Sequence, residues 1–205
     1  MIKVWGRNNS LNVQKVILTL EEIGLPYERT DAGLHFGVVN TAEYRAINPN
    51  GRVPTIDDMG FTLWESNAIV RYLCARYSEG KLWPLDARRR ADADRWMDWQ
   101  QTTLLDPINA IFRPLVRKDV EAKPGVIEAG IKTAEGNAAV LDALLAERPW
   151  VSGGTFGMAD CVIATVVHRW MHLPIERQPR PHLERWYKAI CERPWSSKVL
   201  ILPLS

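Results

Sequence analysis

The first 78 residues alternate between short apolar runs and longer segments of helical periodicity. Five apolar residues recur at the three- and four-residue spacing of an amphipathic helix, namely Val13, Val16, Ile17, Leu20 and Ile23. Gly24-Leu25-Pro26 follows, and a glycine and then a proline commonly end a helix. The short segments Ile2–Trp5 and Tyr27–Thr30, which we interpret as strands, flank this helix. We therefore predict a strand, a helix and a second, parallel strand.

A hairpin and a further helix complete this half of the chain. Residues 55–57 and 61–64 predict two short strands, joined by a compact loop at 58–60. A helix then opens near Ser66, which has the residue type that caps a helix N-terminus. With a short helix at 41–47, the order is βαβ, then α, then ββα. This order resembles thioredoxin and predicts a mixed four-stranded sheet with helices on its faces.

The pattern changes after residue 78, where residues 79–87 carry glycine and proline and predict a linker. Beyond it we find no convincing strand, and apolar residues recur at helical spacing. Pro107 and Pro114 are expected to kink or end the first helix locally. The predicted fold is thus a thioredoxin-like α/β domain at residues 1–78 and an all-helical bundle domain at residues 88–205.

Residues 158–170 are apolar almost all round, which predicts a buried central helix. Gly157 can cap its start, and Asp160 is placed to accept hydrogen bonds from backbone N–H groups of the first turn. His168 lies within this apolar helix and is predicted to be a hydrogen-bonded core residue. We interpret these three residues as structural rather than catalytic.

Composition narrows the class of protein. The formal net charge of the 205 residues is +2, too near neutral to favour nucleic-acid binding. No apolar run approaches the ~20 residues of a membrane span, and no signal peptide is visible. Cys74, Cys161 and Cys191 are far apart, with no CxxC or His/Cys cluster, so neither a metal site nor a disulfide framework is expected. A cytoplasmic location fits this cysteine usage.

Two segments near the hairpin contain residues that could bind a ligand. Pro54 begins a strand after a turn and is a candidate cis proline, beside which Val53 would present its backbone N–H and C=O to an extended peptide. Glu65 and Ser66 set a carboxylate and a hydroxyl beside the free N–H groups of a helix start, which suits both ends of an amino acid. The structural alternative is an ordinary capped helix after a hairpin.

These residues carry a family resemblance. Arg52-Val53-Pro54 followed by Trp64-Glu65-Ser66-Asn67-Ala68-Ile69 resembles the glutathione-binding signature of glutathione S-transferases. The likeness continues in Asn12-Val13-Gln14-Lys15-Val16 and in Gly157-Met158-Ala159-Asp160, so it spans nearly the whole chain.

The resemblance implies how glutathione is bound. Val53 and Pro54 would contact its cysteinyl backbone, and Glu65 and Ser66 would hold its γ-glutamyl head. Arg52 is the candidate for the glycine carboxylate, and His35 is a further candidate for the same end. Glutathione would be a co-substrate, so no separate cofactor is implied, and the resemblance also implies a homodimer.

Ser10 and Asn12 are the candidate catalytic residues, because Ser10 matches the catalytic serine of delta- and theta-like members and Asn12 an asparagine of bacterial nu-like members. No cysteine lies at the start of the first helix, so the thiol must come from the ligand. A thiol has a pKa near 8.5, and a charge-assisted hydrogen bond of roughly 1.5–3 kcal/mol lowers it by ~1–2 units. One hydroxyl donor therefore suffices to ionise half of the thiol at neutral pH, although Ser10 could instead be a simple helix cap.

A hydrophobic electrophile is expected to bind between the domains, where pockets tend to form. Its candidate walls are Trp5, Leu11, Trp99, Phe112 and Arg113. The predicted activity is transfer of the glutathione thiolate to this molecule. Two alternatives remain: a nu-like disulfide reductase that uses glutathione, for which Asn12 is the motive, and a glutathione-binding protein of the same fold without turnover.

Overall fold

Four strands form one mixed sheet in the computed structural model, which describes residues 1–204. β1 (Ile2–Trp5) lies between β2 (Tyr27–Thr30), to which it is parallel, and β3 (Thr55–Asp58), to which it is antiparallel. β4 (Phe61–Trp64) pairs antiparallel with β3 and gives the order β2-β1-β3-β4. The predicted mixed sheet of a thioredoxin-like domain is confirmed.

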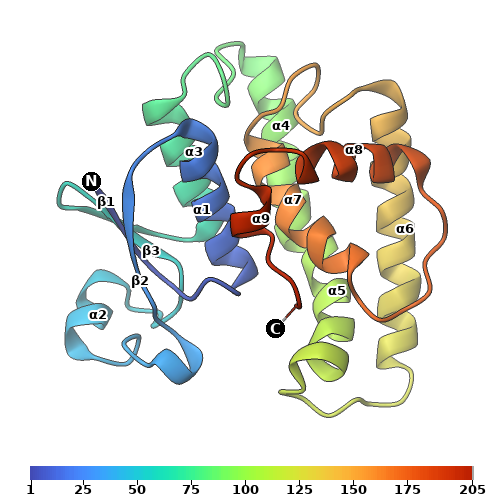
Figure 1. The fold of residues 1–205 in the computed structure, drawn as a ribbon, viewed down its shortest axis with the longest axis horizontal. Helices are drawn as coiled ribbons and strands as arrows, with labels where there is room; N and C mark the ends of the chain where they lie inside the picture. The colour runs from blue at the N-terminus through green and yellow to red at the C-terminus, as the bar shows by residue number, and fades with distance from the viewer. Residues whose placement is uncertain (205) are drawn as a thin grey trace.

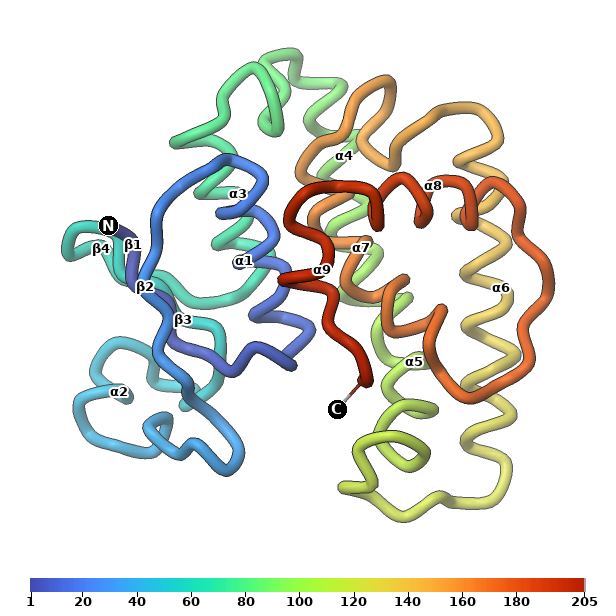
Figure 2. Tube along the Cα trace, viewed as in Figure 1, coloured from blue at the N-terminus to red at the C-terminus, as the bar shows by residue number. Residues whose placement is uncertain are grey.

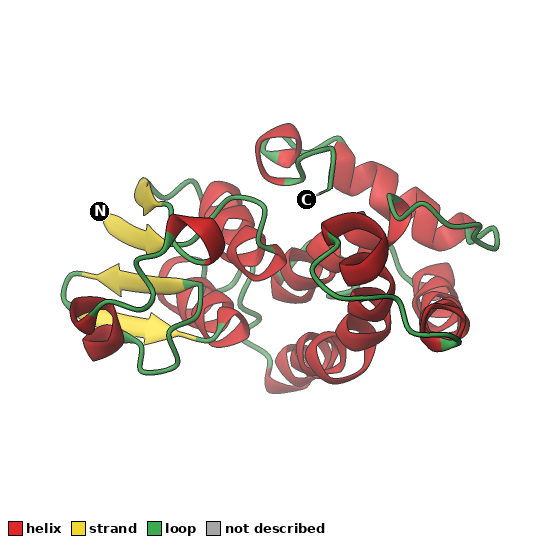
Figure 3. Ribbon diagram, turned by 90° about the horizontal axis from the view of Figure 1, so that it is seen from below, coloured by secondary structure: helices red, strands yellow, loops and turns green. Residues whose placement is uncertain are grey.

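Helices cover both faces of this sheet, as Figures 1 and 3 show. α1 (Leu11–Ile23) and α3 (Ser66–Tyr77) pack together on the face turned toward the rest of the molecule. α2 (Ala42–Ile47) and the short 3₁₀ helix η1 (Leu34–Phe36) belong to the opposite side. α1 ends at Gly24, whose φ of 78° is left-handed, as the glycine predicted.

The C-terminal half is helical. Its segments are α4 (Ala87–Trp99), η2 (Gln100–Leu104), α5 (Leu105–Phe112), η3 (Arg113–Arg117), α6 (Val126–Glu147), α7 (Met158–Met171), α8 (Pro181–Cys191) and α9 (Ser196–Val199). α7 is the predicted central helix, and its residues from Met158 to Trp170 are all buried. The short α9 was not predicted. Residues 78–86 connect α3 to α4, while the exact domain limits stay a prediction.

Near Pro107 and Pro114 the chain stays helical, but it changes from α-helix to π-helix. η2 and η3 are π-helical, and η2 directly precedes the turn that contains Pro107, while η3 contains Pro114. Pro107 has no N–H for the carbonyl of Thr103, and that carbonyl accepts from Asn137 Nδ2 at 3.1 Å instead. The helical path from α4 to η3 therefore continues through both prolines, with two wider turns in place of an end.

Asp160 fixes the start of α7. Its carboxylate accepts from the backbone N–H groups of Gly157 at 3.0 Å and Val151 at 2.8 Å, and from Trp186 Nε1 at 2.8 Å. The side chain is fully buried, and burial raises the pKa of this carboxyl group. His168, further along α7, lies 2.6 Å from the hydroxyl of Tyr187. Both residues are structural, as interpreted, but Asp160 accepts from the N-cap and the preceding loop rather than from the N–H groups of the first turn.

The two halves share one extended core, and α1 packs against α7 as well as α3. The C-terminal segment returns to this junction, where α9 lies against α1 (Figure 2). There Glu22 accepts from Trp195 Nε1 at 2.6 Å and from Arg193 Nε at 2.8 Å. These contacts hold the C-terminal end of α1 against the C-terminal segment of the chain. Within residues 1–204, no helix combines the length and apolar character needed to cross a lipid bilayer.

Candidate functional site

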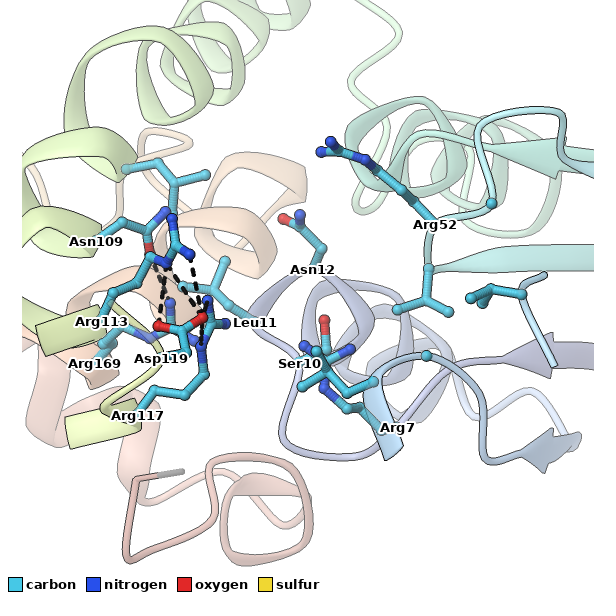
Figure 4. Close-up of a pocket in the computed structure, with 16 residues that line it drawn as sticks. Arg7, Ser10, Leu11, Asn12, Arg52, Asn109, Arg113, Arg117, Asp119 and Arg169 are labelled. Atoms are coloured by element: carbon cyan, nitrogen blue, oxygen red, sulfur yellow. Dashed lines mark hydrogen bonds and ion pairs between the residues drawn. The ribbon is translucent and has the colours of Figure 1, made fainter. Parts of the chain in front are cut away.

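A cavity of about 530 Å³ opens at the N-terminal end of α1, between the sheet domain and the helical domain (Figure 4). The sheet domain contributes Arg7, Ser10, Leu11, Asn12, Gly33, Leu34, Val39, Gly51, Arg52 and Val53. The helical domain contributes Leu105, Asn109, Arg113, Arg117, Asp119 and Arg169. Of the predicted site residues, the structure thus brings together Ser10, Asn12, Arg52, Val53, Leu11 and Arg113.

Ser10 occupies the N-cap position of α1 with extended backbone angles, but its side chain makes no capping hydrogen bond. The first turn of this 13-residue helix contains no acidic residue. The helix start therefore presents free N–H groups and the positive end of its dipole without a built-in anion. A hydroxyl donor at such a place is suited to stabilise an anion such as a thiolate.

The loop before α1 approaches the helix closely because of Gly6. A Cβ atom at this position would lie 2.4 Å from Val13 Cγ2, so any other residue would collide with α1. The loop then turns so that Ser10 N–H donates to the carbonyl of Arg7 at 3.2 Å. Gly6 thereby fixes where Arg7 and Ser10 enter the cavity.

Val53 lies on the other wall with its backbone available. The Val53–Pro54 peptide bond is cis, as considered from the sequence. Tyr44 Oη at 2.6 Å and Asn48 Nδ2 at 2.9 Å both donate to the carbonyl of Arg52 and hold this turn. Within the described chain, the N–H and C=O of Val53 take part in no hydrogen bond. They are free to pair with an extended peptide.

The start of α3 differs in one respect from the sequence interpretation. Glu65, and not Ser66, is the N-cap, with a positive φ of 71° that a non-glycine residue seldom adopts. Ser66 is already helical and buried, and its Oγ donates to Asn12 Oδ1 at 3.3 Å. Neither Glu65 nor Ser66 lines the cavity itself, but Ser66 meets it through Asn12.

Lys15 lies beneath this pair, and sequence reasoning assigned it no role. Its ammonium nitrogen lies within 3.4 Å of four side-chain oxygens, those of Ser66, Asn67, Gln100 and Gln101. Burial lowers the pKa of Lys15 to about 7, although the carboxylate of Glu65 opposes this change. The sequence does show a lysine among the apolar residues of the first helix, and this position could have indicated a buried charge.

Three of the predicted substrate walls lie elsewhere. Trp5 packs with Ala32, Val39 and Tyr44 on the α2 side of the sheet. Trp99 packs against the main core in an edge-on contact with Trp96, and Phe112 is 1% exposed. Helical spacing shows that such residues share a face, but not whether that face meets a pocket or the core.

His35 is exposed in η1, beside Phe36, and does not line the cavity either. Its proposed contact with a glycine carboxylate therefore receives no support from the cavity. Arg52 does line the cavity and remains the candidate for that end.

Positive charge is the feature of the cavity that sequence analysis missed. Besides Arg52 and Arg113, it is lined by Arg7, Arg117 and Arg169, which are far apart in the sequence. Burial and the charge of Arg117 lower the pKa of Arg7, and burial, Arg117 and Arg7 lower the pKa of Arg169. The cavity is therefore strongly cationic, although the sequence analysis expected a hydrophobic electrophile there.

The residues 1–204 hold no group of three or more His, Cys, Asp or Glu side chains placed to bind a metal ion. Cys74 and Cys161 are buried, and burial raises the pKa of both thiols. Neither is a ready nucleophile, so the chemistry available at the cavity is that of hydroxyl, amide and guanidinium donors.

The comparisons with known proteins agree with this arrangement. Residues 9–76 match the family model of the glutathione S-transferase N-terminal domain, and residues 124–189 match that of the C-terminal domain. Glutathione S-transferase GstB of Escherichia coli K12 is 46% identical, with all of both chains covered. The chain belongs to the glutathione S-transferase family.

Further relatives support this glutathione S-transferase assignment. A theta-class glutathione S-transferase from Xanthomonas axonopodis pv. citri, solved with glutathione bound, is 40% identical with a TM-score of 0.94, and the match covers 100% of this chain and 99% of that one. Glutathione S-transferase 3 of Zea mays is 33% identical over 99% of this chain and 95% of its own. The chain is accordingly a transferase enzyme.

Proposed function

We propose that this transferase binds glutathione in the cavity at the start of α1 and transfers its thiolate to an electrophilic centre of a small molecule. One observation carries the proposal: the Ser10 side chain, which caps nothing, and the unpaired backbone groups of Val53 line the same cavity. The glutathione found in the Xanthomonas relative supports the choice of ligand.

The proposed binding mode follows the charges of the tripeptide. The γ-glutamyl head lies at the start of α3, where the carboxylate of Glu65 attracts its ammonium group and the first N–H groups of the helix attract its carboxylate. The cysteinyl backbone pairs with Val53 as an added strand would. Arg52 attracts the glycine carboxylate. This arrangement sets the sulfur beside Ser10.

Catalysis then needs one proton to leave. Ser10 Oγ–H donates to the sulfur and, with the dipole of α1, stabilises the thiolate relative to the thiol. The thiolate attacks the electrophilic carbon, a C–S bond forms, and the leaving group departs with the electron pair of the broken bond. The protein contributes ionisation and proximity, and no protein cysteine takes part.

Calorimetric titration of glutathione tests the binding mode. Glu65→Ala removes the carboxylate that faces the ammonium group, so we expect the dissociation constant to rise about 30-fold, the equivalent of ~2 kcal/mol. Glu28→Ala, an exposed acid on β2, is the matched control and should bind as the wild type does. An unchanged isotherm for Glu65→Ala would remove the head-group assignment.

The names of the relatives favour a transferase over the disulfide reductase that Asn12 suggested. The ultraviolet absorbance of bound thiolate separates a transferase from a protein that only binds glutathione. We expect this absorbance to appear near neutral pH in the complex. Its absence, with binding intact, would support the non-catalytic alternative.

We also propose that the enzyme is a cytoplasmic homodimer. The β3–β4 hairpin carries exposed apolar side chains, namely Met59, Phe61 and Trp64, and such a patch favours an interface. The three free cysteines suit a reducing compartment. Light scattering should give twice the chain mass, and Phe61→Lys should shift the mass toward one chain.

A further inference from the structure

We propose that the electrophile used by this enzyme carries an anionic group, a carboxylate, sulfonate or phosphate, which binds to Arg7 and Arg169 in the cavity at the start of α1. This inference rests on the proposed function and names the substrate class for it. It departs from the hydrophobic electrophile that the sequence suggested.

The guanidinium groups come from both domains. Figure 4 shows Arg113, Arg117 and Arg169 gathered on the helical side and Arg52 on the opposite side, with Ser10 and Asn12 between them. These arginines, with Arg7, line a single cavity. Asp119 is the one acidic side chain among the described residues that line it. The wall therefore carries a large excess of positive charge.

Asp119 neutralises only part of this charge. Its carboxylate accepts from Arg117 Nε at 2.8 Å and from Arg113 Nη2 at 3.2 Å, which also orients these two side chains. Within residues 1–204, neither Arg7 nor Arg169 forms an ion pair with a carboxylate. Besides Arg52, which is assigned to the glycine carboxylate of glutathione, two guanidinium groups at the cavity thus lack an anionic partner among the described residues.

Arg169 is the more informative of the two, because it is only 9% exposed. One nitrogen donates to Asn109 Oδ1 at 2.9 Å, and the guanidinium lies 3.8 Å from the centre of the Phe112 ring. These contacts fix its orientation but leave its charge uncompensated. Burying a charge without a counter-ion is unfavourable, so an arginine kept in this position indicates an anion that arrives with a ligand.

Glutathione itself does not account for this anion. Its proposed anchors, Glu65, Val53 and Arg52, all belong to the sheet domain, whereas Arg169 belongs to α7. Figure 4 places Arg52 on the far side of Ser10 from Arg169. A second substrate that meets the thiolate near Ser10 would extend toward Arg169 and bring its own negative charge there.

A matched pair of electrophiles tests the inference. 4-Chloro-3-nitrobenzoate and 4-chloro-3-nitrobenzamide share the reacting carbon and differ in charge. Their kcat/KM values are each divided by the uncatalysed rate constant with glutathione, which removes the intrinsic difference in reactivity. We expect the normalised value to favour the benzoate by about 10- to 100-fold, the size of a charge-assisted contact, and to converge as salt is added.

Two variants locate the effect. Arg7→Met, at a half-buried position, and Arg169→Met, at a buried one, should each lower the benzoate preference about tenfold or more while the KM for glutathione stays the same. Arg88→Met, an exposed residue of α4, is the control and should keep the preference. If Arg169→Met does not fold, Arg7→Met still decides the question.

Each other outcome counts against the inference in a distinct way. Equal normalised values for the two electrophiles would overturn it and leave the transferase function intact. A preference that persists in Arg7→Met, or a variant that changes only the KM for glutathione, would assign the arginines to another role. No turnover of either compound and no heat with glutathione would instead remove the proposed function itself.

Discussion

The starts of α1 and α7 are two solutions to the same physical problem, the free N–H groups of a first helical turn. At α7, the chain supplies its own acceptors. The N–H of Met158 donates to Leu82 O at 3.3 Å and that of Ala159 to Ser152 Oγ at 3.1 Å, while the carboxylate of Asp160 accepts from the N-cap N–H of Gly157. At α1, Ser10 caps nothing and no acid lies in the first turn. Both positions are buried, but only the second faces a cavity.

The difference separates a structural helix start from one that is available to a ligand. Where the chain satisfies its own donors, the helix start stabilises the fold and has no capacity left for a ligand. Where the donors remain open beside a cavity, they attract an anion from outside. Substitutions at the two places should therefore affect different measurements.

Asp160→Ala should give the largest effect. It leaves several buried N–H donors without an acceptor, and we expect the free energy of unfolding to fall by ~3–5 kcal/mol. Urea denaturation measures this change, with Asp106→Ala, an exposed acid of α5, as the control. A loss below ~1 kcal/mol would mean that Asp160 does not hold this helix start.

Ser10→Ala should leave stability nearly unchanged and lower turnover at pH 6.5 by ~10–100-fold, since one to two pKa units of thiol ionisation are lost. The apparent pKa in the pH–rate profile should rise by the same amount. Ser197→Ala, at an exposed serine of α9, is the control. If turnover is unaffected and stability falls instead, Ser10 belongs with Asp160 as a structural residue.

His168, near the C-terminal end of α7, is expected to make the stability of this helix depend on pH. Burial lowers the pKa of His168 to about 4, whereas the unfolded chain has the ordinary value near 6.5. Between these values the unfolded state binds more protons, so stability is complete above pH 6.5 and is lost as the pH falls toward 4.

We expect His168 to account for about 2 kcal/mol of the decrease in unfolding free energy between pH 6.5 and pH 4.5. His168→Gln has no proton to bind in this range and should lose that part of the pH dependence. Denaturation at both pH values compares the two proteins. Parallel pH dependences would show that other groups cause the acid sensitivity.

Much of the fold could be predicted because its signals are local. α1 ends at Gly24, as the glycine and the following proline predicted, and all four strands form in the short segments predicted to be strands. Asp160 was recognisable because it lies three residues after its cap at the start of an apolar helix. The π-helical turns were not predicted, because a proline shows that a backbone hydrogen bond is lost but not which group replaces it, as Asn137 does at the carbonyl of Thr103.

In the candidate site, too, residues set by local sequence could be predicted and residues placed by tertiary packing could not. Ser10 and Val53 were named because a helix start and a proline turn are short-range features. Arg169 was missed because its place in the cavity depends on how α7 packs against α1. Phe112 was misplaced because an apolar residue on a helix does not reveal that an arginine will lie over its ring.

Lys15 has a consequence for protein engineering. Its ammonium group donates to acceptors from both halves of the chain, Asn67 in α3 and Gln100, the first residue of η2. A chimera that grafts a different helical half onto this sheet half must therefore supply an oxygen where Gln100 now stands. Without that oxygen, Lys15 in the hybrid would lose its shortest hydrogen bond, the one to Gln100 at 2.6 Å, directly beside Ser66.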